Sequence, residues 1–245
     1  MGDRDAGQVT MDSRFSPAME DYLKAIYKLT AGSQRASTNQ IAEEMDVAPA
    51  SATGMIQKLA KSAPPLVNYQ KHQGVLLTAE GESAALEVIR HHRLLELFLH
   101  ERLGYTWDEV HPEADRLEHV ISEEFEDRIA QALGNPSHDP HGEPIPTKDF
   151  EIPAQSTVRL SQVRPQQKAE VERVEHADRE LLRFLATIGV IPQAQLAVIA
   201  YSPYDENLQI LMNGHDQPIV LGYLVTNQIF VRLIEPPDAS NPLEE

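Results

Sequence analysis

The fold of the N-terminal third of this chain is decided by residues 37–60, STNQIAEEMDVAPASATGMIQKLA. Ser37 to Gln40 form a helix-capping pattern, and a short amphipathic helix follows it. Ala48 to Ser51 then combine a turn with a second helix start, and the next helix runs to Ala60. The apolar faces of the two helices are Ile41, Ala42 and Met45, and Ala52, Met55, Ile56 and Leu59. Two short helices joined by a tight turn predict a helix-turn-helix.

The flanking segments extend this motif to a winged helix-turn-helix over residues 15–78. Upstream, Ser16 and Pro17 are typical of a helix start, and Gly32 marks its end. Downstream, residues 66–69 and 75–78 are predicted strands of a β-hairpin, which forms the wing.

In this fold the helix that ends at Ala60 enters the major groove, and its first residues read the bases. Lysines near it and on the hairpin are placed to contact phosphates. The expected DNA-contacting residues are Arg35, Ala50, Ser51, Thr53, Lys58, Lys61 and Lys71. Gly54 lies in the middle of the helix and indicates either close backbone approach or weak base readout.

The charge of the 245-residue chain is unevenly distributed. The net charge is −17, yet residues 1–78 hold equal numbers of basic and acidic side chains. A DNA-binding segment without net charge can still bind phosphates, even when the rest of the chain is acidic. The sequence has no cysteine, no apolar run of membrane-spanning length and no apolar signal segment. We therefore expect a cytoplasmic protein without membrane contact.

The remaining sequence changes from helical to strand patterns. A long helix is predicted from Thr78 to about Gly104, and another from about Trp107 or Pro112 to Leu133. Several short strands and one helix, from Asp178 to Thr187, follow and suggest a small barrel. The predicted strands are Val158–Leu160, 168–174, 195–200, 209–212, 218–221 and 228–233.

These patterns predict an α+β multidomain chain. The expected parts are a disordered tail (1–14), the winged helix-turn-helix (15–78), a helical domain (79–140), a linker (141–155), a small β-barrel (156–236) and a second tail (237–245).

Candidate metal ligands gather in the helical part. Asp115, Glu118 and His119 share one helix face at i, i+3 and i+4, which gives half of a divalent-metal site. His92 and Glu96 form a second i, i+4 pair on the preceding helix. Each set alone is typical of a solvated polar face, but their occurrence on neighbouring antiparallel helices favours a metal site. We interpret His138, Asp139 and His141 as a loop turn, because flexible proline-rich segments hold metals poorly.

The motifs in this order are Met19 to Leu23, the winged helix, His92 to Glu96, His111 to Asp115, and Glu118-His119. This order resembles the diphtheria-toxin-repressor family of metal-dependent transcriptional regulators, in its manganese-responsive branch. The likeness covers about residues 15–235, including His141 to Pro146. It implies a helical domain for metal binding and dimerisation, followed by an SH3-like, FeoA-like domain.

The resemblance also implies two metal sites. The primary site would use Asp21, Asp115, Glu118 and His119. The second site would use His92, Glu96, His111, Glu172 and Glu175. Iron-responsive members carry Met where Asp21 stands and Cys where Asp115 stands. The two carboxylates favour Mn²⁺, with Fe²⁺ second and Zn²⁺, Co²⁺ or Cd²⁺ as substitutes in vitro.

Two-domain manganese members carry Glu where Lys24 stands. The resemblance therefore implies two spaced sites rather than a binuclear one.

The implied function is a homodimeric, metal-dependent repressor of metal-uptake genes that binds double-stranded operator DNA, an inverted repeat. The alternatives are an Fe²⁺-responsive regulator of the same family and a winged-helix regulator that senses a small organic ligand. We predict no enzymatic activity, because di-iron carboxylate enzymes place a Glu-x-x-His motif on each of two helices and this chain lacks that pair.

Overall fold

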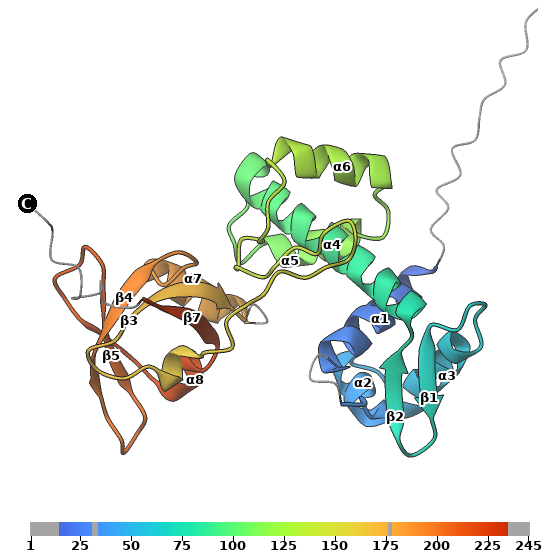
Figure 1. Ribbon diagram of the computed structural model, residues 1–245, viewed down its shortest axis with the longest axis horizontal. Helices are drawn as coiled ribbons and strands as arrows, with labels where there is room; N and C mark the ends of the chain where they lie inside the picture. The colour runs from blue at the N-terminus through green and yellow to red at the C-terminus, as the bar shows by residue number, and fades with distance from the viewer. Residues whose placement is uncertain (1–14, 31–33, 176–177, 235–245) are drawn as a thin grey trace, which may run out of the picture. The chain divides into compact units, whose positions relative to one another are not determined.

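The computed structural model describes residues 15–30, 34–175 and 178–234 (Figure 1). The predicted tails at 1–14 and 237–245, and the helix end at Gly32, lie outside the described residues. The chain forms two compact units. The first unit runs up to Leu95 and adds Glu113–Asn135 and Pro146–Glu151, and the second contains Glu96–Pro112, Pro136–Ile145 and the residues from Ile152 onward.

The winged helix-turn-helix is present in the first unit. Its elements are α1 (Pro17–Thr30), α2 (Thr38–Glu44), α3 (Pro49–Ala60), β1 (Val67–Gln70) and β2 (Gly74–Leu77). The two strands pair antiparallel, with Val67 opposite Leu77. Leu23, Ile41 and Ile56 are fully buried, so the predicted apolar faces of all three helices meet in one core.

Local sequence explains where these helices start. The Ser37 hydroxyl accepts a hydrogen bond from the Gln40 amide (3.2 Å), and the Gln40 side chain accepts one from the Ser37 amide (2.9 Å). This capping box satisfies two amides at the start of α2. Pro49 stands at the first position of α3, where its missing N–H costs nothing.

The helical part contains α4 (Ala79–Leu103), α5 (Val110–Leu117) and α6 (Glu123–Ala132). The prediction of one helix ending at Leu133 is wrong, because the chain turns between α5 and α6. The Val120 amide donates to the Leu117 carbonyl (3.0 Å), and Ser122 caps α6 by accepting from the Phe125 amide (3.3 Å). Glu118 and His119 therefore lie in a turn after α5.

The C-terminal part is a five-stranded antiparallel sheet in the order β6-β5-β4-β3-β7. Its elements are η1 (Leu160–Gln162), β3 (Lys168–Val174), α7 (Arg179–Thr187), β4 (Gln195–Tyr201), β5 (Leu208–Met212), β6 (Ile219–Leu221), α8 (Tyr223–Thr226) and β7 (Ile229–Ile234). The expected strand at Val158–Leu160 is wrong, because the chain enters the 3₁₀ turn η1 at Leu160 and only Arg159 makes a bridge to the sheet. The expected α+β class is confirmed.

The loop turn expected at Asp139 and His141 is present, but this proline-rich segment is held in place by packing and is not flexible. The Val174 amide at the end of β3 donates to the His141 carbonyl (3.0 Å). A Cβ at Gly142 would lie 2.0 Å from the Glu172 carbonyl oxygen, and the Gly142 φ is +87°. Only glycine fits this close approach to β3. His141 and Asp139 are buried.

Candidate metal centres

The first candidate centre, in the first unit, is built around His119. Its Nε2 lies 3.0 Å from Asp21 Oδ1, and its Nδ1 lies 2.6 Å from Glu20 Oε2. Both acids are on α1, whereas His119 is in the turn after α5. Hydrogen bonds to these two carboxylates raise the pKa of His119 to about 10. The ring therefore carries a proton at neutral pH in the absence of metal.

Glu118 is the buried carboxylate of this centre, with 1% of its side chain exposed. His92 Nδ1 lies 2.5 Å from its Oε2, and Lys24 Nζ lies 2.7 Å from its Oε1. Burial alone would raise the pKa of Glu118, but the hydrogen bond from His92 and the charge of Lys24 outweigh it and lower the pKa. Glu118 is therefore held ionised.

Asp21, Glu118 and His119 present ligand atoms that all lie within 4.8 Å of one another. The exposed Asp115 is next to them, with Oδ1 3.5 Å from Lys24 Nζ and 3.4 Å from His92 Nδ1. Carboxylates with one imidazole suit a divalent first-row ion, so this donor set fits a metal.

Two further residues contact the ligands of this centre. His92, expected in the second site, lies against Glu118. Glu20 was not predicted, because the sequence shows only that it is an acid next to Asp21, and its burial is visible in the structure alone. A carboxylate on the far nitrogen of a ligating histidine fixes the orientation of the ring.

The second candidate centre lies within the second unit. Glu96, Asp139 and His141 are buried, and their ligand atoms lie within 4.8 Å of one another. His111 Nδ1 is 3.0 Å from Glu96 Oε1. Two carboxylates and one imidazole therefore converge here, and a second imidazole, that of His111, is hydrogen-bonded to Glu96. This donor set also fits a divalent ion.

The orientation of His141 is fixed by Trp107. His141 Nε2 donates to the Trp107 carbonyl (2.6 Å), and the two rings stack with centroids 5.7 Å apart. Nδ1 therefore faces Glu96 Oε2 at 3.7 Å and Asp139 Oδ1 at 4.0 Å. Burial lowers the pKa of His141, but these two carboxylates outweigh it and raise the pKa.

The two predicted acids on and after β3 lie apart from these groups. Glu172 Oε1 accepts from the Ser156 amide (2.8 Å), and Glu175 pairs with Arg159 (3.3 Å). Within the described part of the chain, no cluster of mutually close ligand atoms includes either acid.

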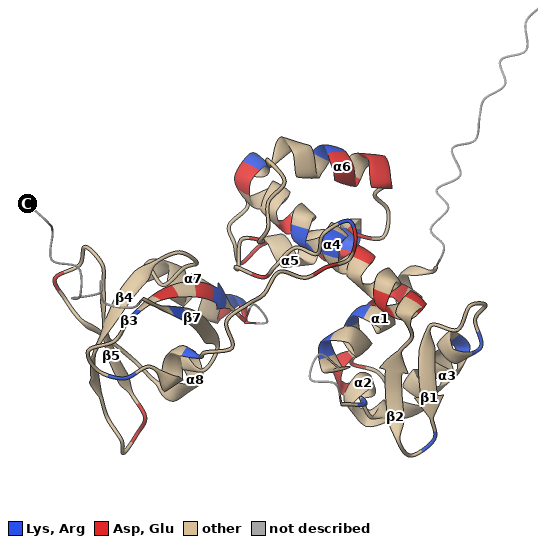
Figure 2. Ribbon diagram, viewed as in Figure 1, with Lys and Arg blue, Asp and Glu red and all other residues tan. Residues whose placement is uncertain are grey.

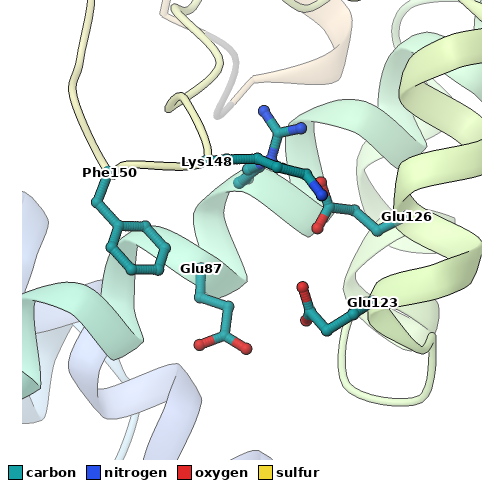
Figure 3. Close-up of a pocket in the computed structure, with 6 residues that line it drawn as sticks. Glu87, Glu123, Glu126, Lys148 and Phe150 are labelled. Carbon is teal, nitrogen blue, oxygen red and sulfur yellow. The ribbon is translucent and has the colours of Figure 1, made fainter.

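A further cluster, Glu87, His91 and Glu123, lies beside a cavity of about 200 Å³ in the first unit. Figure 3 shows Lys148 reaching across this cavity toward Glu126. Arg90 pairs with Glu126 (2.6 Å) and Lys148 with Asp127, so cations of the chain itself balance this acidic region. We assign no ligand to it.

The predicted DNA-contacting residues are distributed over α3 and the wing. Ala50 and Ser51 are exposed at the start of α3, while the Thr53 hydroxyl donates to the Pro49 carbonyl (2.8 Å). The remaining lysines, Lys58, Lys61 and Lys71, are exposed. Figure 2 shows basic positions at the end of α3 and at the turn between β1 and β2.

Arg35 and Gly54 differ from the other predicted DNA contacts. Arg35 donates to the carbonyls of Asn68 (3.1 Å) and Gly74 (3.4 Å) and so bonds to both strands of the wing. No atom lies within 4 Å of the position of a Cβ on Gly54. The space beside α3 is therefore open for close approach of a DNA backbone.

Three family models match the chain. The iron-dependent repressor N-terminal DNA-binding domain matches residues 14–75. The iron-dependent repressor metal-binding and dimerisation domain matches residues 78–147, and the FeoA domain matches residues 158–233. In the described residues, no helix is long and apolar enough to cross a membrane.

Named relatives agree with these matches. The iron-dependent repressor IdeR of Mycobacterium leprae (strain TN) is 32% identical over 209 residues, which cover 80% of this chain and 89% of the relative. The HTH-type transcriptional regulator MntR of Oceanobacillus iheyensis is 37% identical over 118 residues, which cover 48% of this chain and 78% of the relative.

Solved structures give the same result. A manganese-dependent transcriptional repressor in complex with manganese matches with a TM-score of 0.77 and 38% identity, over 87% of this chain and 98% of that chain. ScaR with bound Zn²⁺ matches with a TM-score of 0.72 and 32% identity, over 87% of this chain and 98% of that chain. The resemblance found in the sequence is thus confirmed, and the chain belongs to the three-domain diphtheria-toxin-repressor family of metal-dependent transcriptional repressors.

Proposed function

We propose that this protein is a Mn²⁺-activated repressor of metal-uptake genes that binds an inverted-repeat operator as a homodimer. Fe²⁺ ranks second as activating ion, and Zn²⁺, Co²⁺ and Cd²⁺ are substitutes in vitro. The observation that carries the proposal is the meeting of Asp21, on the first helix of the DNA-binding fold, with Glu118 and His119. Because the ligands are oxygen and imidazole donors without sulfur, they suit Mn²⁺.

The proposed first site uses Asp21, Asp115, Glu118 and His119. His92 supports Glu118, and Glu20 orients the His119 ring through Nδ1. A bound divalent ion would supply positive charge at these carboxylates. Binding requires the loss of the His119 proton, so the affinity depends on pH.

The proposed second site uses Glu96, His111, Asp139 and His141. We favour Asp139 and His141 over the predicted Glu172 and Glu175, because the former pair lies beside Glu96 and is buried. Trp107 holds the His141 ring so that its Nδ1 faces the carboxylates.

The first site couples metal to DNA through α1. Asp21 moves with α2, α3 and the wing, because α1 shares their core. Ligation of Asp21 together with Glu118 and His119 fixes this core against the turn after α5. The recognition helices of a dimer then keep the spacing that two half-sites require. The coupling is reciprocal, so DNA must tighten metal binding by the same factor.

The test is fluorescence anisotropy on DNA from upstream of its own gene and of nearby metal-transporter genes. Titrations contain chelator, Mn²⁺, anaerobic Fe²⁺ or Zn²⁺. We expect tight binding with Mn²⁺, weaker activation by Fe²⁺ and little binding with chelator. Equal binding in chelator would contradict the proposal.

The variant Asp21→Ala tests whether Asp21 couples metal binding to DNA binding. It should lose metal-dependent DNA binding while its circular dichroism stays that of the wild type. Asp149→Ala removes an exposed carboxylate from the loop after α6 and serves as the matched control. An Asp21→Ala protein that still requires Mn²⁺ for DNA binding would show that α1 is not part of the switch.

A further inference from the structure

We propose that Lys24 is a built-in substitute for the divalent ion at the first site. Its ammonium group lies where a cation is needed in the metal-free protein, and the incoming ion has to displace it. The inference rests on the proposed function and concerns how the site sets its own metal threshold.

The contacts of Lys24 occupy both oxygens of the buried carboxylate. Lys24 Nζ lies 2.7 Å from Glu118 Oε1 and 2.8 Å from Oε2, and 3.5 Å from Asp115 Oδ1. Lys24 stands one helical turn after Asp21 on α1, so it reaches the same side of the helix. The ammonium thus bridges two of the proposed ligands and approaches from the element that carries a third.

The first site needs a cation because several carboxylates lie close together there. Asp21, Asp115, Glu118 and Glu20 surround a site in which Glu118 is almost fully buried. An ionised buried carboxylate without a cationic partner is strongly disfavoured. Lys24 provides that partner together with His92, and it links α1 to the turn after α5 as a metal ion would.

The ammonium and a divalent ion cannot share Glu118. Like charges a few ångströms apart repel strongly in a partly buried site, and the ion needs an oxygen that Lys24 holds. The lysine can leave, because 22% of its side chain is exposed and its stem is flexible. The observed free energy of Mn²⁺ binding is therefore less favourable than the intrinsic one by the free energy of removing Lys24 from Glu118.

The test is isothermal titration of Mn²⁺ into Lys24→Met, which keeps the apolar stem and removes the ammonium. We expect the affinity to rise roughly ten- to hundredfold, since a charged hydrogen bond no longer has to be broken first. The melting temperature of the metal-free variant should fall, and the increase caused by Mn²⁺ should exceed that of the wild type.

The matched control is Lys28→Met. Lys28 lies one turn further along α1, pairs with Glu44 at 2.7 Å and has 69% of its side chain exposed. Its removal changes the net charge equally without touching the site. Its Mn²⁺ affinity should stay close to the wild-type value. An equal gain in both variants would overturn the proposal, because long-range charge would then explain the effect.

Unchanged or weaker Mn²⁺ binding by Lys24→Met would also overturn it. If that variant does not fold without metal, Lys24→Arg decides, because it keeps the charge. We expect it to fold and to bind Mn²⁺ no more tightly than the wild type, and tighter binding would contradict displacement. A wild-type protein that does not bind Mn²⁺ would instead contradict the proposed function.

Discussion

His119 lies between two carboxylates of α1, and this position decides how protons compete with metal. Its neighbour in the chain, Glu118, is the buried acid of the same centre. Asp21 and His119 are 98 residues apart in sequence. Helical spacing predicted the cluster at Asp115, Glu118 and His119, but only the resemblance added Asp21, because no local pattern reports such a distant contact.

The raised pKa of His119 predicts a pH dependence of metal binding. At pH values below about 10 the ring is protonated in the metal-free protein, and the ion must expel that proton. The Mn²⁺ affinity should fall roughly tenfold for each pH unit between about 8 and 6. Titration calorimetry in two buffers with different ionisation enthalpies should show about one proton released per ion from His119. If no proton were released, His119 would not be a metal ligand.

The raised pKa of His119 also predicts how the free energy of unfolding of the metal-free protein depends on pH. Because the folded pKa lies above the unfolded value of about 6.5, the contribution of His119 is full below about pH 6.5. It declines as the pH rises and is lost near pH 10. Urea denaturation of the metal-free protein at pH 6 and pH 9 should show this loss, and His119→Gln should reduce the difference.

At the scale of elements, local signals were sufficient for α1 to α3 and for the wing. The capping box at Ser37, Pro49 at the start of α3 and the short turn between β1 and β2 are all encoded within a few residues. The break between α5 and α6 was missed, because apolar residues continue at helical spacing through it. Ser122, which caps α6, was its only local signal.

The position of Asp139 and His141 beside Glu96 was missed for a different reason. Asp139 and His141 lie in a segment whose composition is typical of a loop. Their burial depends on Trp107 and on the backbone of β3, which are distant in sequence. The composition of this segment indicates a flexible backbone, but tertiary packing holds the backbone in one conformation.

The variant Gly142→Ala tests this packing. A Cβ would meet the Glu172 carbonyl oxygen at 2.0 Å, and the positive φ adds strain. We expect a loss of about 2 kcal/mol or more in the free energy of unfolding, together with loss of one bound ion at the second site. Gly214→Ala, with a similar φ but no atom within 4 Å of the added Cβ, is the control. Equal destabilisation by both would mean that the contact with β3 is unimportant.

Asp139→Asn separates the two centres. It removes one carboxylate charge from the second centre and leaves the first untouched. Calorimetry should show one tight Mn²⁺ per chain in place of two. Retention of two tight ions would exclude Asp139 as a ligand.

For the whole molecule, the family comparisons and the fold agree on a DNA-binding part, a metal-binding and dimerisation part and a FeoA domain. The acidic excess of the chain lies outside the DNA-binding part, and basic positions occur at the end of α3 and at the turn of the wing. We expect metal at the first site and DNA at α3 to stabilise the same arrangement of the protein.

The most direct measurement is the Mn²⁺ affinity of the protein with and without operator DNA at one pH and one salt concentration. We expect DNA to tighten Mn²⁺ binding by the same factor by which Mn²⁺ tightens DNA binding, and Asp21→Ala to abolish both effects. An Mn²⁺ affinity that is the same in the presence and absence of operator would contradict this expectation.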